Sequence, residues 1–228
     1  MNPGIDWQAI RLSVRLAVVV VSILLVTGVP LAWWLTFRRR RWSFLVEAVV
    51  ALPLVLPPSV LGFYLLVAMG SNSVLGRAWA AITGHPLAFT FEALVLASLL
   101  YSLPFVVQPI AVAFAQVDRT LLEASATLGR SGMETFLRVI LPLSRDGILA
   151  AAVLGFAHTL GEFGVVLMVG GNIPGVTRTV SLSVYDQVQS FQFDAANRTA
   201  LLLLGFSLLA LATVYGLLRR PWAVSATP

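Results

Sequence analysis

The sequence predicts an all-α integral membrane protein with five membrane-spanning helices. Of its 228 residues, 58% are hydrophobic and only 11% are charged, whereas a soluble domain carries about a quarter charged residues. Five apolar stretches are each long enough to cross a bilayer core of about 30 Å. Arginines gather at the ends of these stretches, as is typical of the flanks of membrane helices.

The predicted spans follow one another along nearly the whole chain. They cover residues 16–37, 44–69, 93–115, 147–169 and 199–218. We interpret the first as a retained helix rather than a signal peptide. Its apolar part is too long, it lacks a small-residue cleavage site, and the strongest positive cluster follows it. We therefore expect one transmembrane domain over residues 7–218, with short tails at 1–6 and 219–228.

The absence of two residue types from the sequence excludes several kinds of site. There is no cysteine, which excludes disulfides and cysteine-ligated metals. All 15 basic residues are arginine, and the lack of lysine excludes a P-loop, which needs Lys to reach the phosphates. If ATP drives this protein, we expect another chain to bind ATP and Mg²⁺, with no cofactor or metal in this one. Because the arginines flank spans, they do not indicate nucleic-acid binding.

The arginines also predict the orientation. Ten lie in the loops after the first, third and fifth spans, and five lie in the other set. Cytoplasmic loops carry the excess of positive charge. We therefore expect the N-terminus outside, the C-terminus in the cytoplasm, and the loop between the third and fourth spans in the cytoplasm.

This polar loop predicts two short capped helices. Thr120 and Glu123 have the spacing of a capping box, and so do Ser131 and Glu134. Gly129 stands where the first helix should end, as a glycine that can take positive φ. A helix, a tight turn and a second helix at the membrane surface form a docking surface.

The same loop resembles the EAA loop of binding-protein-dependent ABC importer permeases. The family pattern is Glu-Ala-Ala, three residues, Gly, nine residues, Ile, one residue, Leu-Pro. The matching positions are Glu123, Ala124, Gly129, Leu141 and Pro142, with Ser125 replacing the second Ala and Val139 replacing Ile. The resemblance implies that the loop enters a cleft on a separate cytoplasmic ATPase and transmits ATP-driven motion. The alternative is that the loop is an ordinary amphipathic connector between membrane helices. Pro142 predicts the end of the second helix or a kink that leads into the next apolar stretch.

Three prolines interrupt the second span. Pro53, Pro57 and Pro58 each remove a backbone donor. Inside a membrane, the freed carbonyls must be satisfied by neighbouring helices or by a water-lined cavity. Two interpretations stay open: a kinked packing helix, or a break that lines the translocation path or acts as its hinge.

Glu162 is the one acidic residue well inside a predicted span, and His158 lies four residues earlier on the same helical face. A central charge costs on the order of 3 kcal/mol, so Glu162 should face protein or water. The pair either pins the fourth span or takes part in gating. We do not expect a metal site here, because the sequence offers no third ligand beside His158 and Glu162. Ser98 and Ser102, with His158, lack the spacing of a known intramembrane enzyme.

The loop after the fourth span has two parts. Residues 170–175 contain three glycines and one proline, which is turn chemistry. Residues 180–193 carry apolar side chains at positions 184, 188 and 191, near helical spacing. This second part predicts an amphipathic helix along the outer surface.

Three segments narrow the resemblance to molybdate-type permeases: 53–66, 160–164 and 171–179. His158 is one departure, since many relatives carry arginine there. The resemblance implies the type I ABC importer permease fold, in a bacterial plasma membrane. It also implies two copies of this chain, two ATPase subunits and an external molybdate-binding protein, and import of molybdate or tungstate.

The resemblance makes Asn172 and Arg178 candidates for contact with the binding protein. Arg178 could instead attract the anion, and a solvated loop arginine is an equally simple interpretation. Sulfate and thiosulfate permeases share the 162–164 element and the docking loop, so their substrates are the alternative. An intramembrane enzyme is the less favoured alternative function.

Overall fold

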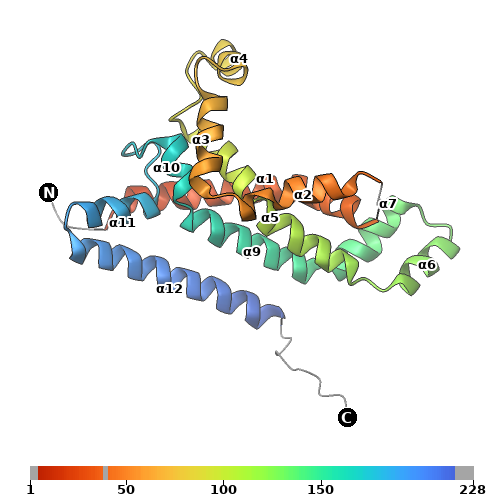
Figure 1. The fold of residues 1–228 in the computed structure, drawn as a ribbon. Coiled ribbons are helices and arrows are strands. Elements are labelled where there is room, and N and C mark those ends of the chain that lie inside the picture. The colour runs from red at the N-terminus through yellow and green to blue at the C-terminus, as the bar shows by residue number, and fades with distance from the viewer. Residues whose placement is uncertain (1–4, 38–40, 219–228) are drawn as a thin grey trace.

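The computed structural model describes residues 5–37 and 41–218, and within them it contains helices and loops but no strand (Figure 1). The predicted tails at 1–6 and 219–228 lie mostly outside the described residues, and so do Arg38 to Arg40, Arg219 and Arg220. The helices are α1 (Trp7–Phe37), α2 (Ser43–Val55), α3 (Pro58–Met69), α4 (Val74–Thr83), α5 (Phe91–Ala115), α6 (Arg119–Thr127), α7 (Gly132–Thr135), the π-helix η1 (Phe136–Ile140), α8 (Leu141–Leu143), α9 (Arg145–Gly161), α10 (Gly164–Gly170), α11 (Val180–Gln189) and α12 (Phe193–Leu218).

Helices α1, α5 and α9 pack together and form the centre of the fold. Apolar side chains of α1 and α5 supply most of the buried cluster, and α9 adds a small residue to it. The members from these three helices are Leu16, Val20, Leu24, Ala32, Leu35, Leu94, Val106, Val107, Ile110, Phe114 and Ala151. Helix α12 contacts α9 and α11 and runs along the side of this bundle (Figure 1).

Glycines let α9 approach α5 closely. A Cβ on Gly155 would lie 2.5 Å from Val106 Cγ2, and a Cβ on Gly147 would overlap Ala113. Close approach through small residues is a common way for helices to gain packing contacts in a membrane, where burial of apolar surface gives no driving force.

The second predicted span is interrupted at its prolines, as predicted, and divides into α2 and α3. Pro53 remains inside α2, whereas Leu56 is extended with ψ of 134° and Pro57 precedes the first turn of α3. A residue before proline is driven out of the helical region, and Pro58 is suited to the first helical turn, where its missing N–H is not needed. The axes of α2 and α3 differ by 112°.

The fourth predicted span, residues 147–169, also divides into two helices. Helix α9 ends at Gly161, Glu162 is extended with ψ of 133°, and α10 starts at Gly164. Glu162 is therefore at a helix break and not within a helix. The expectation that Glu162 and His158 share one helical face and contact each other is therefore wrong.

The chain just before α9 contains a third irregularity. Pro142 has no N–H to bond to the carbonyl of residue 138, and its ring crowds that carbonyl. The preceding turn widens into η1, with the Leu141 N–H bonded to Phe136 O. The segment Gly132–Leu143 then meets α9 at an angle of 69°, which confirms the predicted kink.

Three described helices, α1, α5 and α12, are individually long and apolar enough to cross a membrane. The bent pairs α2–α3 and α7–α9 would raise the number to five if each is one span. Helix α1 begins at Trp7, earlier than predicted. The predicted helix at 180–193 is present as α11, but its buried side chains are Val180, Leu182 and Ser183 rather than the expected set.

We predict that Gly155→Ala lowers the stability of the bundle. The added methyl group overlaps Val106, and overpacking of this kind costs about 1–3 kcal/mol. Gly205 in α12 is surrounded by open space, because no neighbouring atom lies within 4 Å of where its Cβ would stand, so Gly205→Ala is the matched control. Thermal unfolding in detergent should show a lower midpoint for Gly155→Ala only; equal midpoints would contradict the close packing of α5 and α9.

Candidate coupling loop and intramembrane cluster

The polar loop predicted as a docking surface lies at one end of the helical bundle, and we name residues 118–142 the coupling loop. It consists of α6, a turn at Gly129, α7, η1 and the start of α8. In Figure 1 it occupies the end of the bundle opposite α11. The loop therefore projects from the bundle at a single end, where another protein can reach it.

Local hydrogen bonds explain the start of each helix in the coupling loop. Ser131 and Glu134 form the predicted capping box. The pKa of Glu134 is lowered, first by the bond from the Ser131 N–H and then by the Arg130 guanidinium. The predicted box at Thr120 is wrong, because the Asp118 side chain caps α6 by accepting from the Thr120 N–H.

The turn between the two helices has the predicted geometry. Gly129 takes φ of 72° directly after the α6 C-cap. Its N–H bonds to Ala126 O, and the Arg130 N–H bonds to Ser125 O. These bonds cover the last carbonyls of α6 and reverse the chain direction.

Ser125, one of the two residues that depart from the family pattern, connects the two halves of the loop. Its hydroxyl lies 2.8 Å from the Thr135 hydroxyl and is buried. Glu123 and Ala124 are exposed, Val139 and Leu141 are half-buried, and Pro142 is exposed. The most exposed large apolar side chains of the coupling loop, Leu128 at 78% and Met133 at 59%, were not predicted from the sequence.

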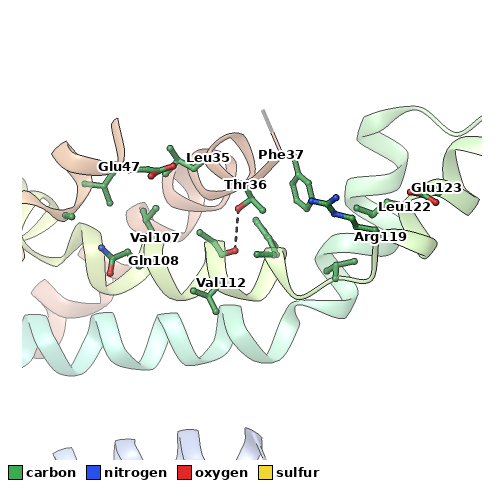
Figure 2. Close-up of a pocket in the computed structure, with 16 residues that line it drawn as sticks. Leu35, Thr36, Phe37, Glu47, Val107, Gln108, Val112, Arg119, Leu122 and Glu123 are labelled. Atoms are coloured by element: carbon green, nitrogen blue, oxygen red, sulfur yellow. Dashed lines mark hydrogen bonds between the residues drawn. The ribbon is translucent and has the colours of Figure 1, made fainter. Parts of the chain in front are cut away.

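A cavity of about 940 Å³ connects the coupling loop with the bundle (Figure 2). It lies between the ends of α1 and α5, the middle of α2 and helix α6. Glu47, Gln108, Arg119 and Glu123 are its charged and amide side chains, and the rest of the wall is mostly apolar. Glu123 therefore belongs both to the predicted docking motif and to the wall of this cavity.

The two helix breaks meet at a second cavity of about 580 Å³, which we name the break cavity. Its lining residues are Pro58, Ser59, Tyr101, Ala157, His158, Gly161, Glu162, Phe163 and Gly164. A Cβ on Gly164 would lie 2.7 Å from Pro58 Cβ, and one on Gly62 would lie 2.8 Å from Met168 Cβ. Helices α3 and α10 therefore pack directly against each other, and Pro58, His158 and Glu162 come together. Pro53 is buried in α2, and Pro57 is exposed.

His158 and Glu162 bond to different serines of α5 and not to each other. The Ser98 hydroxyl donates to Glu162 Oε2 at 2.7 Å, and Ser102 Oγ lies 2.9 Å from His158 Nδ1. The ring of His158 also stacks on Phe105, with centroids 3.7 Å apart. Glu162 Oε1 is buried without a hydrogen-bond partner among the described residues. The cluster ties the break after α9 to the middle of α5.

The Ser102–His158 pair has the distance expected of a nucleophile and a base, yet it does not form a reactive site. Ser102 has 0% exposure, and its hydroxyl also lies 2.8 Å from Thr159 Oγ1. A substrate could not reach this hydroxyl, because it is buried. Within the described ranges, no group of three or more His, Cys, Asp and Glu side chains could hold a metal ion.

The two residues predicted to contact a binding protein lie at the other end of the bundle. Asn172 and Arg178 belong to the loop between α10 and α11. Arg178 Nη2 lies 2.9 Å from Asp186 Oδ2, and Arg178 Nε donates to Asn172 Oδ1. Arg178 is therefore in an ion pair and is not a solvated loop arginine.

Sequence comparisons agree with this architecture. The family model described as "Binding-protein-dependent transport system inner membrane component" matches residues 17–220. The molybdenum transport system permease protein ModB of Azotobacter vinelandii is 50% identical over 210 residues, which are 92% of this chain and 93% of that protein. The ModB protein of Escherichia coli K12 is 38% identical over 185 residues, with 81% of each chain covered.

Solved structures share the fold at low identity. A bacterial alginate ABC transporter in complex with a periplasmic protein matches with a TM-score of 0.73 and 16% identity, covering 93% of this chain and 78% of that chain. The MetNI methionine ABC transporter in an inward-facing conformation matches with a TM-score of 0.71 and 18% identity, covering 92% and 93%. These matched proteins are transport components and not enzymes. The chain belongs to the family of binding-protein-dependent transport system inner membrane components.

Proposed function

We propose that this chain is the permease subunit of an ATP-driven importer for molybdate or tungstate. The observation that carries the proposal is the 50% identity to a molybdenum transport permease across nearly the full length of both chains. The alternative substrates, sulfate and thiosulfate, are supported only by the shared 162–164 element and coupling loop. An enzymatic role is disfavoured by the buried Ser102 hydroxyl.

The proposed assembly contains two copies of this chain and two cytoplasmic ATPase subunits, with ATP and Mg²⁺ held by the ATPases. An external binding protein delivers the oxyanion to a pore between the two permeases. We propose five spans in one transmembrane domain over residues 7–218, with the N-terminus outside a bacterial inner membrane. The arginines of the coupling loop support this orientation, because positive loops stay in the cytoplasm.

In the proposed mechanism, α9 transmits motion from the ATPase to the pore. The 17 residues of α9 give a rod of about 25 Å. One end joins the coupling loop at a 69° bend, and the other end joins the break cavity, where Glu162 is bonded to Ser98. Displacement of the coupling loop therefore moves α9, and the break after Gly161 lets α10 respond separately.

The substrate assignment predicts selective uptake. Proteoliposomes that contain this chain, its ATPase and its binding protein should accumulate labelled molybdate only with ATP and Mg²⁺. A hundredfold excess of sulfate should leave the rate nearly unchanged, whereas tungstate should compete. Uptake of sulfate at a rate equal to that of molybdate would contradict the assignment.

The coupling role predicts that strain at Gly129 uncouples transport. A β-branched residue at φ of 72° is strained by about 1–2 kcal/mol, so Gly129→Val should distort the turn and reduce ATP-dependent uptake at least severalfold. Gly84 has φ of 79° and open space around it at the end of α4. Gly84→Val imposes the same strain elsewhere and should leave uptake close to that of the unchanged protein. Equal losses in both variants would reject a specific role for the coupling loop.

The break cavity predicts a gating role for Glu162. In Glu162→Gln, the side-chain carbonyl can still accept from Ser98, so uptake per inserted protein should be largely retained. In Glu162→Leu, the Ser98 hydroxyl loses its acceptor in a buried site, at a cost of about 1–3 kcal/mol, and the break is no longer held to α5. Uptake should fall at least severalfold while membrane insertion, measured by immunoblot, is unchanged. Uptake by the Glu162→Leu variant at the wild-type rate would contradict a role for Glu162 in gating.

A further inference from the structure

A third cavity, of about 870 Å³, continues from the break cavity toward the coupling loop, and we name it the inner cavity. Its wall starts at Phe105 in α5 and extends to Asp118 and Leu121 of the coupling loop. Helices α5 and α9 supply most of this wall, and Leu54 of α2 and Tyr215 of α12 complete it. The inner cavity therefore connects the middle of the bundle with the end that carries the coupling loop.

The break cavity and the inner cavity lie end to end along the bundle. In three segments of the chain, a residue that lines the break cavity is four positions away from a residue that lines the inner cavity. These pairs are Tyr101 and Phe105 on α5, His158 and Leu154 on α9, and Pro58 and Leu54 across the break between α2 and α3. Four residues of a helix span about 6 Å. A single layer of side chains therefore separates the two cavities.

That layer contains two stacked rings, Phe105 and His158, which we name the aromatic barrier. Their centroids are 3.7 Å apart and their planes differ by 22°. Atoms at this spacing are in van der Waals contact, so no ion passes between the rings. The ring of His158 is also fixed in place, because Ser102 Oγ lies 2.9 Å from its Nδ1 and the ring of Tyr101 lies 4.9 Å from it, centroid to centroid.

Polar side chains lie on both sides of the aromatic barrier. Ser59 is exposed and lines the break cavity, and Gln108 is exposed and lines the inner cavity, about one turn of α5 beyond Phe105. Polar groups within a membrane span face protein or water rather than lipid. This arrangement favours two hydrated cavities with an aromatic layer between them.

We propose that the aromatic barrier closes the translocation path, and that the oxyanion passes from the break cavity to the inner cavity only when the ring of His158 leaves Phe105. This inference rests on the proposed function and names the side chains that close its path. His158 lies on α9, one turn before that helix ends at Gly161, whereas Phe105 belongs to α5. A displacement of α9 relative to α5 therefore acts directly on the stacked rings.

The first test uses the absence of cysteine from this chain. Ser59→Cys places a thiol in the break cavity, and Gln108→Cys places one in the inner cavity. The complete permease–ATPase complex, in proteoliposomes without nucleotide, receives a charged, membrane-impermeant thiol reagent on one side at a time, and labelling of the permease is measured by mass. The two thiols should react from opposite sides. Reaction of both from the same side, or of neither, would overturn the proposal.

The second test removes one ring of the aromatic barrier. In Phe105→Ala, His158 loses its stacked partner, so the two cavities should become connected. The Gln108→Cys thiol should then react severalfold faster from the side that reaches Ser59→Cys. Labelling that stays one-sided in an assembled Phe105→Ala complex would overturn the proposal.

A matched control is another aromatic contact of α9. Phe206 of α12 contacts Phe156 of α9 with ring centroids 5.6 Å apart, and neither residue lines the break cavity or the inner cavity. Phe206→Ala removes an aromatic ring of the same size from a neighbour of α9 and should leave labelling one-sided. An equal gain of labelling in Phe206→Ala and Phe105→Ala would contradict a specific barrier at Phe105.

Substitutions of His158 distinguish its ring from its hydrogen bond. His158→Phe keeps an aromatic ring but cannot bond to Ser102, so the cavities should remain separate. His158→Ala removes the ring and should connect them as Phe105→Ala does, which also provides a second removal of the stack. If His158→Phe connects the cavities as fully as His158→Ala, the bond to Ser102 and not the stack closes the path, and the proposal fails.

ATP-dependent molybdate uptake, measured on the same proteoliposomes supplied with the binding protein, distinguishes this proposal from the proposed function. An unchanged complex that imports molybdate while both thiols react from one side would contradict the aromatic barrier alone. Opposite-sided labelling in an unchanged complex that imports no molybdate would support the barrier and contradict the proposed function.

Discussion

The fold depends on satisfying the backbone at two helix breaks within the bundle. The hydrocarbon region of a membrane offers no water to free N–H and C=O groups, so broken helices persist only where protein or a cavity covers them. Ser181 of α11 donates to the carbonyls of Glu162 and, more weakly, Leu160, and Ser98 of α5 donates to the Glu162 side chain. Small residues at Gly62 and Gly164 bring α3 and α10 into contact, so that the two breaks close one cavity.

The breaks also give the proposed transporter its moving parts. Helix α9 is continuous from Arg145 to Gly161 and packs on α5 along its length through Gly147 and Gly155. It ends where the chain can bend, and the coupling loop that precedes it ends at the widened turn η1 and the kink after α8, which allow another bend. A stiff rod between two bends can carry a displacement from one bend to the other.

The sequence predicted the features that depend on local chemistry. Apolar length indicated the positions of α1, α5 and α12, and Ser131, Glu134 and Gly129 indicated the turn of the coupling loop. Prolines indicated a break in the second span but not its angle of 112°. The division of the fourth span and the serine partners of His158 and Glu162 could not be predicted, because they depend on contacts with α5 that are 56 and 64 residues away in sequence. The bonds of Asn172 and Arg178 to Asp186 were not predicted either, because they depend on how α11 folds back against the loop before it.

The central claim is that the coupling loop moves with the nucleotide state of a partner ATPase. The chain has no cysteine, so Leu128→Cys, at an exposed position, can carry a single spin label on each permease. Electron spin resonance on the transport-competent complex would measure the distance between the two labels. The account predicts that this distance shortens when ATP binds and returns after hydrolysis. A distance that stays constant through the cycle, in a complex that imports molybdate, would contradict it.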